Sequence, residues 1–210
     1  MSQRTRVGVL ISGRGSNMQA LVRAARAPDC PFEIVLVLSE NPDAAGLAWA
    51  REHGVAAEAV DRRLFGRDRE AHERTLQARL TSAGVELVAL AGYMRLLTPW
   101  FVSAWSGRLL NIHPSLLPKH PGLHTHQRAL DAGDAEAGCT VHLVIDEVDA
   151  GEVLGQARVP VLPGDDADTL AARVLEQEHR LYPAVLAQFV RHLPSPSRGE
   201  GPEMGVRAQG

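Results

Sequence analysis

The residues most able to do chemistry lie between Leu109 and His126, in the segment LLNIHPSLLPKHPGLHTH. These 18 residues hold four of the nine histidines and three of the thirteen prolines. Asn111 and His113 are two apart, so in a strand both side chains point to the same side, and Pro114 favours an extended His113. An amide and an imidazole placed together can donate hydrogen bonds to a developing oxyanion. The alternative for His113 is a strand-end histidine bonded to a neighbouring carbonyl.

The other histidines do not predict a metal site. His124 and His126 form an HTH sequence, but neither an HExxH motif nor a nearby cysteine pair accompanies them. We therefore expect no metal, with these two histidines lining a crevice or bonding to the backbone. His142 lies in the alternating segment CTVHLVI, on the same face as Thr140 and Val144. Such a half-buried histidine is expected to be structural.

Two further segments offer partners for this chemistry. IDEVDAG, residues 145–151, contains Asp146, Glu147 and Asp149, and a carboxylate that reaches His113 would favour the imidazolium form and fix the ring. On composition alone it is an ordinary acidic turn. SGRGSN, residues 12–17, can turn backbone N–H groups toward an anion at a helix N-terminus. Its alternative is a tight turn with Ser16 as N-cap.

Strand-like and helix-like segments alternate along the chain and would position these residues. We expect strands near 6–11, 32–39, 56–60, 86–92, 108–113, 139–145 and 155–161, and helices near 16–26, 43–54, 68–83, 126–131 and 168–193, with a loop between 92 and 108. The pattern predicts an α/β fold, a single Rossmann-like domain with a mostly parallel, twisted sheet and helices on both faces. Loops after three of its strands would then face one crevice. The domain should span residues 1–193, followed by a disordered tail over 194–210.

Composition excludes several classes of protein. The 210 residues are 45% hydrophobic and carry a net charge of −3, which suits a globular protein and argues against a nucleic-acid partner. The sequence shows neither a secretion signal nor a membrane span, so we expect a cytoplasmic protein without a membrane partner. Cys30 and Cys139 lack CxxC spacing and fit a reducing compartment.

Five stretches in order, VLISGRGSNMQAL, LAGYMRLL, RLLNIHPSLLPKHPGLHTH, DEVDAG and RVLEQEHRLYP, resemble phosphoribosylglycinamide formyltransferase, over roughly residues 6–189. The resemblance implies transfer of a formyl group from 10-formyltetrahydrofolate to the amine of 5'-phosphoribosylglycinamide, in purine biosynthesis and without metal. It implies a Rossmann-like fold and small-molecule partners only. Oligomeric state is expected to be a monomer or a weak homodimer.

The resemblance also implies roles for individual residues. The catalytic residues would be Asn111, His113 and Asp149; the substrate-binding residues would be Gly15, Ser16 and Asn17 at the phosphate and Glu178 at the ribose or glycinamide; the folate-binding residues would be Arg69, Met94, Arg95, Leu96, Leu97 and Asn111. Two positions depart from the family pattern. Ala150 replaces a frequent glycine, and Leu175 replaces a polar substrate contact.

Related and unrelated functions compete with this one. Formyltetrahydrofolate deformylase shares the catalytic trio but has an N-terminal regulatory domain, and methionyl-tRNA formyltransferase needs a C-terminal RNA-binding domain; we expect room for neither. A nicotinamide-dependent dehydrogenase needs a fuller GxGxxG than SGRGSN, where Ala20 stands at the third glycine, and an acid after the second strand, where Glu40 lies. A non-catalytic phosphoribosyl-binding module is the remaining alternative.

Overall fold

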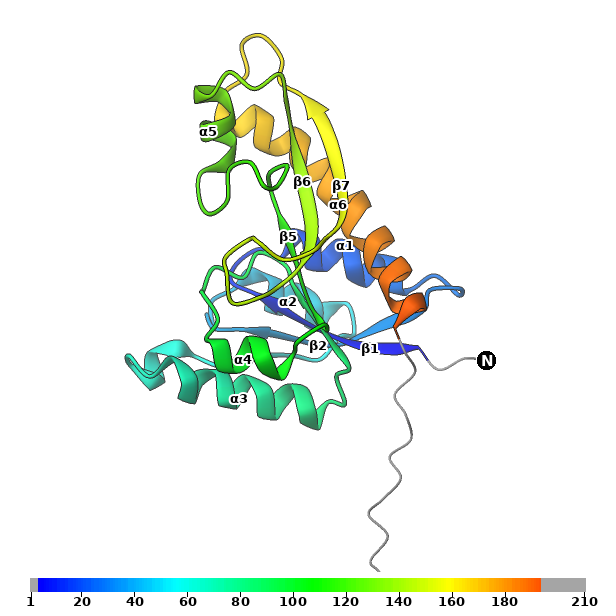
Figure 1. Cartoon of the computed structure of the whole chain (residues 1–210). Helices are drawn as coiled ribbons and strands as arrows, with labels where there is room; N and C mark the ends of the chain where they lie inside the picture. The colour runs from blue at the N-terminus through cyan, green and yellow to red at the C-terminus, as the bar shows by residue number, and fades with distance from the viewer. Residues whose placement is uncertain (1–3, 194–210) are drawn as a thin grey trace, which may run out of the picture.

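The fold is a seven-stranded sheet with helices on both faces, seen in a computed structural model that describes residues 4–193 (Figure 1). The expected tail therefore lies outside the described residues. The strands are β1 (Thr5–Ile11), β2 (Phe32–Ser39), β3 (Ala57–Ala59), β4 (Leu87–Leu90), β5 (Leu109–His113), β6 (Glu136–Leu143) and β7 (Val153–Pro160). The helices are α1 (Ser16–Ala25), α2 (Ala45–Glu52), the 3-10 turn η1 (Arg62–Phe65), α3 (Arg69–Ser82), α4 (Pro99–Ala104), α5 (Thr125–Asp131) and α6 (Ala167–His192).

The strand order is β3-β2-β1-β4-β5-β6-β7. The first five strands in the chain pair in parallel, whereas β6 pairs antiparallel with both β5 and β7. The predicted mostly parallel sheet and α/β class are confirmed. The order reverses between β1 and β4, which is where an open α/β sheet leaves a crevice at the carboxyl ends of its strands.

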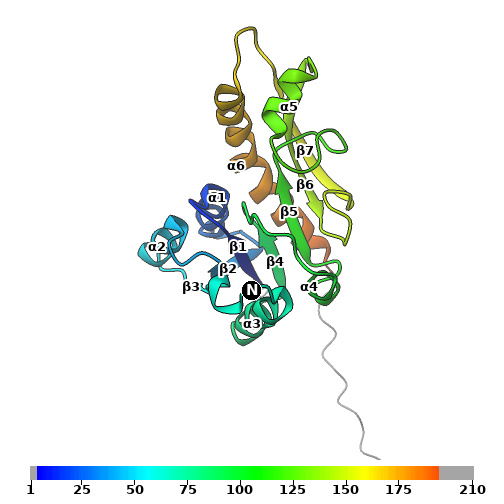
Figure 2. The same cartoon turned by 90° about the vertical axis from the view of Figure 1, so that its left-hand side faces the viewer.

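Both faces of the central strands β1 and β4 are buried, which explains their near-continuous apolar sequences. On β1, the residues Val7, Val9 and Ile11 belong to one core cluster, shared with α1, α2 and α6. Leu10 belongs to the other cluster, shared with α3 and α4. Figure 2 shows α1 and α2 on one side of β1 and β4, and α3 on the other.

The long helix α6 packs along one face of the sheet. It starts with a capping box between Asp166 and Thr169 and packs against β6, β7 and α1 (Figure 1). The fully buried Tyr182 hydroxyl lies 3.1 Å from the carbonyl oxygen of Leu90 and 3.2 Å from that of Leu110. This hydroxyl therefore ties α6 to β4 and β5.

The expected loop between 92 and 108 is wrong in part, because it contains the short helix α4. Its N-cap is Thr98, whose hydroxyl accepts from the Phe101 N–H, and Pro99 occupies the first turn. Phe101 and Trp105 bury this segment against α3. A six-residue helix shows too little periodicity to be read from sequence, and packing against α3 determines it.

Candidate active site

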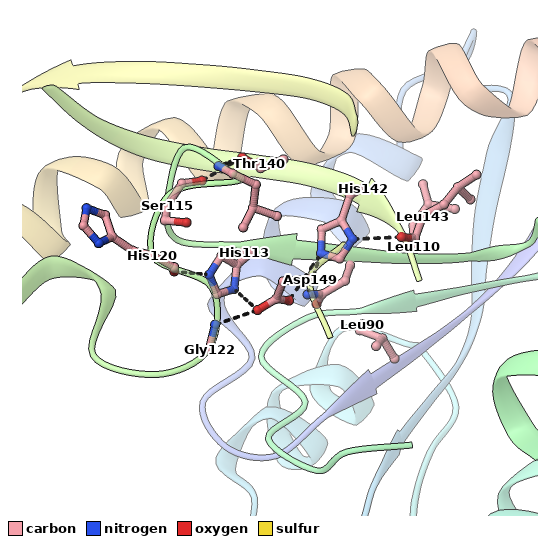
Figure 3. A network of polar contacts seen from close by, with 12 residues as sticks. Leu90, Leu110, His113, Ser115, His120, Gly122, Thr140, His142, Leu143 and Asp149 are labelled. Carbon is pink, nitrogen blue, oxygen red and sulfur yellow. Dashed lines mark hydrogen bonds and ion pairs between the residues drawn. The ribbon is translucent and has the colours of Figure 1, made fainter. Parts of the chain in front are cut away.

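His113 and Asp149 lie together, as predicted, although they come from different parts of the fold (Figure 3). His113 ends β5, and Asp149 lies on the connection between β6 and β7. His113 Nδ1 is 3.4 Å from Asp149 Oδ2, and the two side chains are only 8% and 9% exposed. The Gly122 N–H donates to the same carboxylate oxygen at 2.8 Å. The carboxylate is thus held against the imidazole by a backbone donor.

The second ring nitrogen of His113 is also occupied. His113 Nε2 lies 3.1 Å from the backbone carbonyl oxygen of His120. The strand-end alternative considered from sequence is therefore present together with the carboxylate contact. Because both ring nitrogens face oxygen acceptors, the surroundings suit an imidazolium, which has two N–H donors.

The loop that follows His113 is anchored to the neighbouring strand. The Thr140 hydroxyl of β6 donates to the Ser115 carbonyl at 2.7 Å and accepts from the Leu117 N–H at 3.1 Å. Gln156 of β7 donates to the Leu117 carbonyl at 2.8 Å. These bonds hold the proline-rich loop in one conformation and so fix its backbone beside His113.

Asn111 joins the same network through His142, which sequence reasoning had left outside the site. The two residues are partners in the antiparallel register of β5 and β6. Asn111 Nδ2 lies 3.2 Å from His142 Nε2, which is 3.6 Å from Asp149 Oδ1. His142 thus contacts two of the predicted catalytic residues, and the sequence had predicted only a structural position for it. No signal within CTVHLVI could have shown this, because the contact depends on cross-strand register.

The turn between β1 and α1 presents a helix N-terminus at the same edge of the sheet. Gly15 is the N-cap, in the left-handed region with φ of 67°, and no side chain caps the helix. The alternative with Ser16 as N-cap is wrong, because Ser16 is the first residue of α1. The first N–H groups of α1 thus lack a side-chain cap, which is the arrangement that binds an anion.

Asn17 and Glu178, both predicted to contact substrate, contact each other. Asn17 Nδ2 donates to Glu178 Oε2 at 2.5 Å, and both residues are buried. Burial raises the pKa of the Glu178 carboxyl, and the bond from Asn17 opposes that rise. The contact brings the last helix to the turn between β1 and α1.

Four of the residues predicted for folate, 94–97, lie on a loop after β4, whereas Arg69 lies on α3 and Asn111 on β5. Met94 and Leu96 are 68% and 62% exposed, whereas Leu97 packs against the core cluster of α3 and α4. The loop is held by the Ser12 hydroxyl, which accepts from the Met94 N–H, and by the Arg69 guanidinium, which donates to the Leu96 carbonyl. Arg95, on the same loop, is half-buried. Large exposed apolar side chains on an anchored loop suit a flat, aromatic ligand.

Two exposed apolar residues beside Asp149 escaped the sequence analysis. Ile145 and Val148 are 46% and 51% exposed on the connection between β6 and β7, a segment in which the sequence indicates only the carboxylates or an acidic turn. Val144 of this connection packs on the same core cluster as Leu97. The signal in the sequence was two large apolar residues in a turn too short to bury them.

Two residues depart from the family pattern, Ala150 and Leu175. At Ala150 no left-handed conformation is needed, because the positive φ in this turn belongs to Asp149, at 55°. Leu175 is half-buried on α6.

The two histidines of the HTH sequence lie at the start of α5. His124 is the N-cap of this helix, with a φ of 58°. Burial lowers the pKa of half-buried His126, and nearby His113 lowers it further by a smaller amount.

Residues 4–193 meet neither the requirements of a metal-binding cluster nor those of a membrane-spanning helix. In this part of the chain, no group of three or more His, Cys, Asp and Glu side chains is arranged to hold a metal ion. None of the described helices is both long and apolar enough to span a membrane.

Comparison with known proteins identifies the family. The profile described as "Formyl transferase" matches residues 5–186. The chain belongs to the formyl transferase family.

Within this family, the resemblance to phosphoribosylglycinamide formyltransferase is confirmed. The chain is 49% identical over 181 residues to the Escherichia coli K12 enzyme of that name, covering 86% of this chain and 85% of that protein. The crystal structure of the Brucella melitensis enzyme has 55% identity and a TM-score of 0.86, covering 91% of this chain and 98% of that one. The chain is also 47% identical over 190 residues to the Drosophila melanogaster trifunctional purine biosynthetic protein adenosine-3, of which it spans only 14%.

Proposed function

We propose that the chain transfers the formyl group of 10-formyltetrahydrofolate to the amine of 5'-phosphoribosylglycinamide in de novo purine biosynthesis. The products are formylglycinamide ribonucleotide and tetrahydrofolate. The observation that carries this proposal is the contact of His113 with Asp149 at the sheet edge that also bears the uncapped N-terminus of α1. Similarity to phosphoribosylglycinamide formyltransferases along nearly their whole length supports it.

The proposed reaction needs no metal. The amine attacks the formyl carbon, a C–N bond forms, and the carbonyl electrons move to oxygen. Asn111 and protonated His113 would donate hydrogen bonds to this oxyanion, each worth about 3–4 kcal/mol in the transition state. For His113, donation from Nε2 replaces its contact with the His120 carbonyl. The bond to N10 of the folate then breaks, and the proton lost by the amine reaches N10 by a relay through water and Asp149.

The remaining predicted residues would bind the two substrates. Gly15, Ser16 and Asn17 suit the substrate phosphate because helix N-terminal N–H groups bind anions, and Glu178 beside Asn17 suits the ribose or glycinamide. The folate would lie along Met94, Leu96 and Leu97 and next to Asn111. Arg95 would approach its pterin or glutamyl end, and Arg69 would make a further contact with it.

The test is tetrahydrofolate release measured with and without phosphoribosylglycinamide. The transferase should release tetrahydrofolate only when the amine is present. Equal release without it, with formate as product, would favour the deformylase alternative, and binding of the ribonucleotide without turnover would favour the non-catalytic module.

A substitution in the turn between β1 and α1 tests the proposed phosphate site. In the same assay, Ser16→Ala should raise the KM for the ribonucleotide more than the KM for folate.

We further infer a cytoplasmic enzyme that is a monomer or a weak homodimer, with neither nucleic acid nor membrane as partner. The net charge of −3 and the two unpaired cysteines, Cys30 and Cys139, support this inference. Sedimentation at several concentrations tests the oligomeric state.

A further inference from the structure

His142 is packed against the catalytic residues although its own position is inside the sheet. It lies on β6 opposite Asn111 and is 2% exposed. The titratable side chains that face it are Asp149, on the connection to β7, and His113, on β5. Figure 3 shows the ring between the Leu143 carbonyl and the Asp149 carboxylate.

Its hydrogen bonds define where the imidazole proton lies. His142 Nδ1 is 2.8 Å from the carbonyl oxygen of Leu143, and a carbonyl can only accept, so Nδ1 carries the proton. In a neutral ring Nε2 then has a lone pair. Asn111 Nδ2, at 3.2 Å, can only donate. The two contacts are both satisfied by the neutral ring protonated on Nδ1.

A second proton on His142 would rearrange this site. The Nε2–H of an imidazolium would point at the Asn111 amide donor, and Asp149 Oδ1 lies 3.6 Å from the same nitrogen. Asp149 would then be shared between two cationic rings. Burial lowers the pKa of His142, and His113 adds to that effect, while the Leu143 carbonyl and the Asp149 charge oppose it. The neutral form is therefore maintained at neutral pH.

We infer that His142 is a positioning residue, whose Nε2 lone pair takes one N–H of the Asn111 amide and so aims the other N–H at the formyl oxygen. The inference rests on the proposed function. The side-chain amide of an asparagine can flip, which exchanges the positions of its oxygen and nitrogen, unless a partner distinguishes these two atoms. His142 supplies that distinction, because only the Asn111 nitrogen can donate to it.

The test compares two substitutions with a matched control. His142→Leu removes the acceptor, and kcat should fall about tenfold or more while both KM values stay within about twofold, because the oriented donor acts in the transition state. His142→Gln retains an acceptor at the position of Nε2 and should recover most of kcat. His72→Leu is the control, since His72 is also 2% exposed and bonds to a carbonyl, that of Val60, outside the site. It should leave kcat unchanged.

Two further measurements distinguish a positioning role of His142 from a purely structural one: the pH dependence of kcat and the tautomer of the His142 ring. The wild-type kcat should fall at acid pH as His142 gains a proton, and this part of the fall should be missing in His142→Gln. Nitrogen-15 NMR of the wild-type protein should show the His142 proton on Nδ1, a result that does not require any variant to fold. A proton on Nε2, or a wild-type kcat in folded His142→Leu, would overturn the inference while leaving formyl transfer intact. Absence of transfer by the wild type would instead remove the proposed function.

Discussion

Asp149 connects the polar groups of the site, because its two carboxylate oxygens face two different histidines. Oδ2 is 3.4 Å from His113, and Oδ1 is 3.6 Å from His142. Its backbone is left-handed, a conformation that Asp and Asn adopt more readily than most residues. Asp149→Asn can therefore keep the turn while removing the charge.

The first prediction is that His113 and Asp149 act as a unit. His113→Ala should lower kcat about 100-fold or more with folate binding retained, because the lost donor acts in the transition state. Asp149→Asn should lower kcat, since the carboxylate charge that lies 3.4 Å from His113 Nδ1 is gone. The double variant should be little worse than the poorer single one. Steady-state kinetics over pH measure all three, and additive losses would contradict the coupling.

The second prediction concerns Glu178, whose pKa is raised above its ordinary 4.5 by burial. The folded protein thus holds this proton more tightly than the unfolded chain, so the free energy of unfolding falls as pH rises through 4.5 to the raised value. Glu178→Gln has no carboxyl group to ionise, so its free energy of unfolding does not fall in this pH range. Its thermal midpoint at neutral pH should therefore lie above that of the wild type, by about 2–4 °C for each kcal/mol of unfolding free energy regained. The KM for the ribonucleotide should increase.

Calorimetry at several pH values measures the Glu178 effect. Glu176→Gln, an exposed neighbour on the same helix, is the matched control and should leave the midpoint unchanged. A midpoint of Glu178→Gln that stays at or below wild type at neutral pH would show that the carboxylate is not penalised by burial.

At the scale of elements, the connection between β6 and β7 is the part that local sequence predicts least. β6 ends beside the start of β5, where the Val144 N–H donates to the Leu109 carbonyl. The chain must then fold back to bring Asp149 to the other end of β5. Gly151 permits this return, because a Cβ there would lie 1.8 Å from the Leu143 carbonyl oxygen.

The third prediction separates two adjacent positions of that turn. Gly151→Ala should destabilise the protein by about 1–3 kcal/mol and reduce activity, since the backbone must shift and carry Asp149 with it. Ala150→Gly should cost at most about 1 kcal/mol, from added freedom of the unfolded chain, and leave kcat unchanged. Thermal unfolding and kcat measure both. A larger loss from Ala150→Gly than from Gly151→Ala would contradict this description of the turn.

Strands and long helices could be predicted from sequence, and cross-strand contacts could not. The bounds expected for 32–39 agree with β2, because both of its faces are buried and its apolar run is continuous. The pairing of Asn111 with His142 follows instead from the register of β5 and β6. The site residues that match the family's motifs could be named from the sequence alone, without knowledge of the fold. His142 could not, because nothing near it in the sequence refers to Asn111.

At the scale of the whole molecule, the sheet gathers three loops at one edge. The turn after β1 presents helix N–H groups, the loop after β4 presents exposed Met94 and Leu96, and β5 ends in His113. Because β1, β4 and β5 are neighbours in the sheet, an anionic ribonucleotide and a folate can meet where His113 and Asp149 lie. This arrangement suits formyl transfer between them.

The most direct test follows the formyl carbon itself. The protein is mixed with 10-formyltetrahydrofolate labelled with carbon-13 in the formyl group and with phosphoribosylglycinamide, and the labelled carbon is followed by NMR. We predict that the label moves to the formamide of formylglycinamide ribonucleotide as tetrahydrofolate accumulates, and that His113→Ala slows this about 100-fold or more. Label that appears as free formate at the same rate with and without the ribonucleotide would contradict the account.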